Sequence, residues 1–123
     1  MRRLLVVDDE TLVADTLTDI FRKNGFEVRT AYSADTALEI AREFTPHLLL
    51  CDIDMPSRDG LELMSDIGRE LPGCPILVLT GFYNRLTGVH ERAGTLQQPV
   101  NILTKPCQPV ELLREVTIML ATA

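Results

Sequence analysis

The feature that most limits how this chain can fold is an alternation between short apolar runs and longer stretches of helical periodicity. Short runs of this kind are typical of strands buried on both faces of a parallel sheet. Strands that alternate with helices over short connections predict an α/β fold, with a doubly wound, five-stranded parallel sheet. The predicted strands are Leu4–Val7, Phe26–Ala31, Leu48–Cys51, Pro75–Leu79 and Val100–Leu103.

Apolar residues at helical spacing predict a helix after each of these strands. Asn24 and Gly25 supply the left-handed stop of the first helix, whereas Gly88 and Gly94 interrupt the apolar pattern of the fourth. The five predicted helices cover Glu10–Lys23, a stretch between the N-cap Ser33 and Pro46, the Leu61–Leu71 segment, a part of residues 82–99, and a stretch that opens with Pro109.

Composition narrows the classes of protein that the chain can represent. Its 123 residues suit a single domain over residues 1–123, and the longest apolar runs are far below the ~20 residues that span a bilayer. A net charge of −6 argues against binding to nucleic acid or to anionic membranes. The three cysteines, at positions 51, 74 and 107, form no metal or disulfide pattern and favour a reducing cytoplasm.

Polar residues follow four of the five apolar runs, at the points where the predicted strands end. In open parallel sheets, ligands bind beyond the carboxyl ends of the strands, so these side chains are expected to converge. They are Asp8 and Asp9 after the first run, Asp52 and Asp54 after the third, Thr80 after the fourth, and Lys105 after the fifth.

Carboxylates crowded at one edge repel one another, and a single lysine does not compensate them. Oxygen ligands select a hard divalent cation, with Mg²⁺ as the first choice and Mn²⁺ or Ca²⁺ as alternatives. A metal, a carboxylate nucleophile, a hydroxyl and a lysine together suit the transfer of a phosphoryl group to an aspartate.

Four stretches of the chain carry a resemblance to a known family: LLVVDDE at 4–10, LLLCDIDMPSRDG at 48–60, ILVLTG at 76–81 and LTKP at 103–106. Over essentially its whole length the chain resembles the CheY-like receiver domain of two-component response regulators. The resemblance implies a flavodoxin-like (βα)5 fold with strand order 2-1-3-4-5 and a cytoplasmic location. It also implies a protein that catalyses only its own phosphorylation and dephosphorylation and is otherwise no enzyme.

The resemblance assigns a role to each acidic residue of the proposed site. Asp52 would be the phosphoacceptor, receiving a phosphoryl group from the phosphohistidine of a histidine kinase or phosphotransfer protein. Asp9 would bind Mg²⁺ directly and Asp8 through water, while Asp54 would supply a backbone carbonyl and Asp52 a carboxylate oxygen. The output partner is not implied. A monomer is expected, with dimerisation on phosphorylation left open.

The resemblance also assigns the residues around the acidic ones. Thr80 would hydrogen-bond a phosphoryl oxygen, and Lys105 would pair with Asp52 or its phosphate, with a cis bond to Pro106. Gly81 would leave access to the phosphoryl group. The chain departs from the family at Ile102, where receivers commonly place an aromatic residue that turns inward on activation.

Three rival functions remain. The apolar run before Asp52-x-Asp54 also occurs in phosphohydrolases of the haloacid dehalogenase type, but Pro56 stands where those enzymes place threonine. A metal nuclease or topoisomerase would pair Glu10 with the same two aspartates, which the acidic net charge disfavours. A receiver-like module that is never phosphorylated would act through protein contacts alone.

Overall fold

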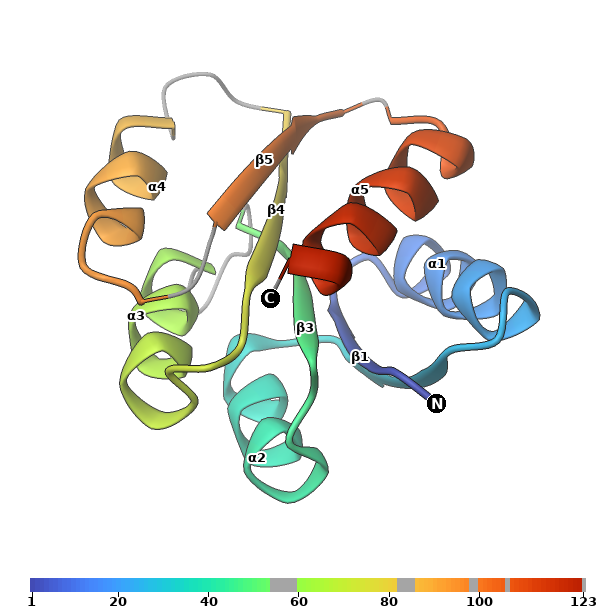
Figure 1. Cartoon of the computed structure of the whole chain (residues 1–123), viewed down its shortest axis with the longest axis horizontal. Coiled ribbons are helices and arrows are strands. Elements are labelled where there is room, and N and C mark those ends of the chain that lie inside the picture. The colour runs from blue at the N-terminus through green and yellow to red at the C-terminus, as the bar shows by residue number, and fades with distance from the viewer. Residues whose placement is uncertain (54–59, 82–85, 98–99, 106, 123) are drawn as a thin grey trace.

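The computed structural model describes residues 1–53, 60–81, 86–97, 100–105 and 107–122, and strands alternate with helices along the chain (Figure 1). The strand bounds agree with the predicted ones to within one residue at each end. The fourth helix, predicted within residues 82–99, covers Leu86–Ala93. The elements are β1 (Arg3–Val7), α1 (Thr11–Lys23), β2 (Glu27–Ala31), α2 (Ala34–Phe44), β3 (Leu48–Asp52), α3 (Gly60–Glu70), β4 (Ile76–Thr80), α4 (Leu86–Ala93), β5 (Val100–Thr104) and α5 (Pro109–Thr122).

The strands form one parallel sheet in the order β2-β1-β3-β4-β5, which confirms the predicted doubly wound topology. The order reverses direction next to β1, because the chain moves outward to β2 and then crosses back to β3. In open α/β sheets a ligand site lies beyond the carboxyl ends of the strands at such a switch point.

Alternate residues of each strand supply two separate apolar cores, one on each face of the sheet. Leu4 and Val6 of β1 pack in the core shared with α1 and α5, whereas Leu5 and Val7 pack in the core shared with α2 and α3. Figure 1 shows α1 and α5 on one side of the sheet and α2, α3 and α4 on the other. Every residue of β3 and β4 is buried, as expected of central strands covered on both faces.

A capping side chain and a turn glycine mark two of the helix ends that the sequence predicts. The Ser33 hydroxyl accepts a hydrogen bond from the backbone N–H of Thr36 at 3.2 Å, as an N-cap does. After α1 the chain turns at Gly25, whose φ of 91° suits glycine. Among the described helices none is long and apolar enough to cross a membrane.

Candidate phosphoacceptor site

Strand register brings the predicted site residues to one edge of the sheet. Val7 of β1 lies opposite Cys51 of β3, so Asp8, which follows β1, lies next to Asp52, which ends β3. On the other side β4 pairs with β5, and the backbone N–H of Lys105 donates a hydrogen bond to the Thr80 carbonyl at 2.9 Å. The convergence predicted from the strand ends is therefore observed for the described residues.

The side chains at this edge form an acidic cluster with one ammonium group. Carboxylate oxygens of Asp8, Asp9 and Asp52 all lie within 4.8 Å of one another. The Lys105 ammonium lies 3.1 Å from Asp52 Oδ2 and 4.0 Å from Asp8 Oδ2. Asp8, Asp52 and Thr80 are buried, with exposed fractions of 1%, 2% and 1%, whereas Asp9 is more exposed.

Comparison with known proteins decides what this arrangement is. The family model described as the response regulator receiver domain matches residues 4–117, which include every residue of the acidic cluster and Lys105. The chain belongs to this family. Receiver domains interact with histidine kinases and with output domains, so the coarse function is that of a two-component signalling module.

Solved receivers share the fold over nearly the whole chain. A putative response regulator from Chloroflexus aurantiacus is 33% identical, with a TM-score of 0.85 and 98% of each chain covered. A CheY-like receiver domain protein from Methanospirillum hungatei is 26% identical, with a TM-score of 0.89, 99% of this chain and 95% of that chain covered. In NtrX from Brucella abortus, 29% identical with a TM-score of 0.86, the match covers 98% of this chain and 27% of that chain. A receiver of this kind therefore also occurs within a longer protein.

Burial disfavours the charged form of Asp8. Its Oδ1 accepts a hydrogen bond from the Glu10 N–H at 3.0 Å, but its buried Oδ2 accepts none within the described residues. Burial, and then the neighbouring Asp52 charge, raise the pKa of Asp8 to about 6 against the Glu10 hydrogen bond, which lowers it. Burial alone would lower the pKa of Lys105, but the carboxylates of Asp52 and Asp8 outweigh it and raise that pKa.

This donor set fits a hard divalent cation. Three carboxylates face one ammonium group, and the Asp8 Oδ2 atom is a buried acceptor that no described donor satisfies. A cation ligated by carboxylate oxygens would compensate both the charge and the missing partner. Receiver domains bind Mg²⁺ at an acidic pocket, and these three carboxylates form an acidic cluster of that kind.

Four further residues were assigned from the family resemblance. Asp54 and the bond between Lys105 and Pro106 lie outside the described residues. Gly81 is exposed and directly follows the buried Thr80. Ile102, at the usual aromatic position, is half-buried and packs against the core shared with α2 and α3.

Gly60 is a residue of the site that the sequence analysis did not single out. A Cβ atom there would lie 2.5 Å from Ile53 Cα and 2.9 Å from the carbonyl oxygen of Asp52. Because these are backbone atoms, α3 can begin this close to the end of β3 only with glycine. In the sequence, Gly60 stands at the end of the LLLCDIDMPSRDG stretch, where the pattern predicts only that glycine belongs to a turn.

Proposed function

We propose that residues 1–123 act as one receiver domain that accepts a phosphoryl group on Asp52 in a Mg²⁺-dependent reaction. The donor is the phosphohistidine of a histidine kinase or of a phosphotransfer protein. The observation that carries the proposal is the buried Asp52 carboxylate, 3.1 Å from the Lys105 ammonium within a cluster of three carboxylates. The phosphorylated domain then signals to a protein partner or an output domain.

The proposed transfer exchanges one bond to phosphorus for another. A carboxylate oxygen of Asp52 attacks the phosphorus atom, the bond from phosphorus to the donor histidine nitrogen breaks, and that nitrogen keeps the electron pair. The Lys105 ammonium pairs with charge on the phosphoryl oxygens, and the Thr80 hydroxyl hydrogen-bonds one of them. Asp8, Asp9, Asp52 and the Asp54 carbonyl would hold Mg²⁺. When bound, Mg²⁺ neutralises developing charge on the phosphoryl group.

Hydrolysis of the acyl phosphate by water then returns Asp52 to its starting form, so the domain turns over only its own modification. Phosphorylation adds charge and acceptor oxygens at the sheet edge. We propose that Thr80 and Lys105, which end β4 and follow β5, transmit this change to the packing of the last elements.

Intact-protein mass after incubation with acetyl phosphate tests the proposal. The wild type should gain one phosphoryl group with Mg²⁺ present and none with a chelator, and Asp52→Asn should gain none under either condition. Asp19→Asn makes the same charge change at an exposed position of α1 and should label like the wild type. If neither acetyl phosphate nor a histidine kinase labels the wild type, the phosphorylation-independent module replaces this proposal.

A further inference from the structure

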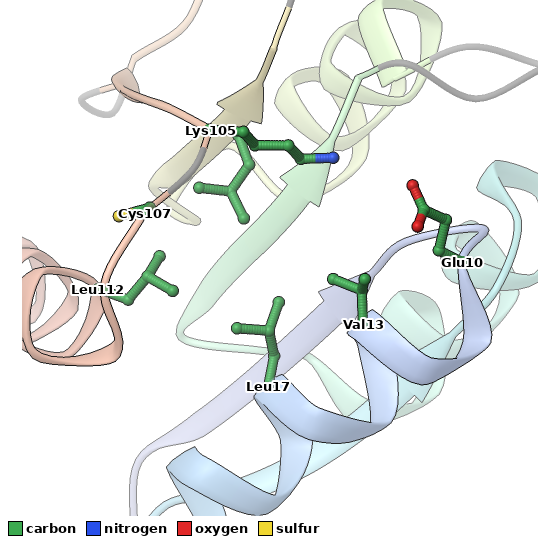
Figure 2. A pocket seen from close by; sticks show the side chains of 7 residues that line it. Glu10, Val13, Leu17, Lys105, Cys107 and Leu112 are labelled. Atoms are coloured by element: carbon green, nitrogen blue, oxygen red, sulfur yellow. The ribbon is translucent and has the colours of Figure 1, made fainter.

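A hollow of about 420 Å³ opens beside the acidic cluster, between α1 and the residues that lead from β5 into α5. Its walls are mainly apolar and come from Val13 and Leu17 of α1, Leu79 of β4, Leu112 of α5, and Cys107. Figure 2 shows the charged groups of Glu10 and Lys105 toward one end of this hollow and Cys107 and Leu112 toward the other. The hollow is open to solvent on one side, and its volume lies within the ~300–1,000 Å³ that is usual for small-molecule sites.

The hollow continues along α1 into a second, more apolar one of about 310 Å³. The two share Val13, Leu17, Cys107 and Leu112, and the second reaches on to Ile20 and Pro109. An occupant would therefore contact apolar side chains along most of its length, and would meet charged side chains only at the end near the acidic cluster.

The charged groups at that end of the hollow determine which sign of charge a bound molecule should carry. The Lys105 ammonium is already compensated by Asp52 at 3.1 Å and by Asp8 at 4.0 Å. Within the part of the chain that the structure describes, no cation lies within ion-pair distance of the Glu10 carboxylate, although its charge contributes, after Asp52 and Asp8, to raising the pKa of Lys105. An anion at this end would meet Glu10 and the acidic cluster behind it, whereas a cation would gain a partner in Glu10.

We propose that this hollow binds a small organic cation, a primary ammonium group on an apolar body about the size of one aromatic ring. The apolar body lies between Val13, Leu17 and Leu112, and the ammonium group pairs with Glu10. The site goes beyond the proposed function, since its binding requires neither Mg²⁺ nor phosphorylation. The occupant also touches the stem of Lys105, so it is placed to affect Asp52; only this coupling rests on the proposed function.

Titration of the metal-free protein with phenethylamine, followed by the amide NMR shifts of the labelled chain, tests binding without any phosphorylation. Shifts should concentrate at α1 and at the start of α5. Phenylethanol, which has the same ring without the charge, should bind more weakly, and phenylpropionate, which is anionic, most weakly of the three. Absence of saturable shifts in this region, or an equal or stronger response to phenylpropionate, would overturn the proposal.

Variants separate this site from weak binding elsewhere on the surface. Val13→Phe and Cys107→Phe fill the hollow from opposite walls and should each weaken phenethylamine binding about tenfold or more, because the buried apolar area is lost. Glu10→Gln should weaken the amine about threefold, as expected for an exposed ion pair, and leave phenylethanol unchanged.

Glu43→Gln is the matched control, because it removes the same charge from an exposed position of α2 on the opposite face. It should leave all three affinities unchanged. Thermal unfolding checks that each filled variant is folded. If both folded Phe variants bind phenethylamine as the wild type does, the hollow is not the site.

Discussion

The two ends of the β1–β3 strand pair differ in how they treat polar groups. At the amino end, the backbone N–H of Arg3 donates a hydrogen bond to His47 Nδ1 at 2.8 Å. The backbone N–H of His47 donates one to the Arg3 carbonyl oxygen, also at 2.8 Å. The Arg3 guanidinium also donates to the Phe44 and Thr45 carbonyls, which α2 leaves unpaired at its end. At the carboxyl end, three carboxylates crowd together, and one buried oxygen of Asp8 has no hydrogen-bond donor among the described residues.

The difference shows which end of the strand pair stabilises the fold and which end carries the candidate site. Paired polar groups at the amino end cost little on burial, because each lost water is replaced by a protein partner. At the carboxyl end, burial of like charges opposes folding and is offset only in part by Lys105. The end that carries the acidic cluster is thus the less stable end of the strand pair.

The largest effect is expected from the close approach of α3 at the carboxyl end. Gly60→Ala would bring a methyl group within 2.5 Å of Ile53 Cα, so α3 or the end of β3 must shift. We expect a loss of about 1–3 kcal/mol in the free energy of unfolding, measured with urea.

Gly81→Ala is the control at the same edge, because its nearest atom would be Lys105 Cβ at 3.9 Å, an ordinary contact. Its change should stay within about 0.5 kcal/mol. Equal effects of the two substitutions would show that the carboxyl end of β3 is no tighter than that of β4.

A smaller effect of opposite sign is expected for Asp8→Asn. Since folding raises the pKa of Asp8 to about 6 from 3.8, its contribution to stability is present below the lower value and lost as the pH rises through the higher one. In the metal-free protein at neutral pH, the neutral amide should therefore raise the free energy of unfolding by about 1–2 kcal/mol. Urea unfolding with a chelator measures it.

The same advantage should vanish near the unfolded pKa and reverse when Mg²⁺ is added, because the wild type gains a ligand that the variant binds less well. Asp9→Asn makes the same change at a more exposed carboxylate and should stabilise the metal-free protein less. Destabilisation by Asp8→Asn without metal would contradict the contrast between the two ends.

The sequence predicted that the polar side chains at the strand ends converge, because their convergence depends on where those strands end. Each apolar run marks a buried strand, and parallel strands bring their carboxyl ends together, so Asp8, Asp52, Thr80 and Lys105 could be grouped without a structure. The bounds of α4 were harder to place. Glycine at 88 and 94 interrupts the apolar pattern, and among its described side chains Val89 is the one buried in the core.

Close approaches between particular atoms could not be predicted in this way. Gly60 lies against the backbone of Asp52, and Asp8 Oδ2 has no hydrogen-bond donor among the described residues. Both features depend on distances of a few ångströms between elements. The same holds for Glu10, which the sequence offered only as a ligand in the rival nuclease and which the structure places in the lining of an apolar hollow.

The smallest expected effect belongs to the amino end and has the opposite dependence on pH. Burial, and then the positive charges of Arg3, Arg2 and the chain's amino terminus, lower the pKa of His47, whose Nδ1 must be unprotonated to accept the Arg3 N–H. The unfolded chain therefore takes up a proton first as the pH falls below about 6.5. The stability from this hydrogen bond is fully present above that pH and is lost as the pH falls through the lower pKa of the folded state, at a cost of less than about 1 kcal/mol.

His47→Asn isolates this effect, because its Oδ1 atom takes the place of Nδ1 and can accept the same hydrogen bond but does not titrate. Urea unfolding of both proteins between neutral and mildly acidic pH should show the wild type losing stability relative to the variant. Asp8 acts in the reverse direction over part of this range, since its folded form gains a proton first. The difference between the two curves removes that shared contribution. Parallel curves would mean that the hydrogen bond to His47 adds no pH-dependent stability, and the amino end would then owe its stability to the Arg3 guanidinium contacts.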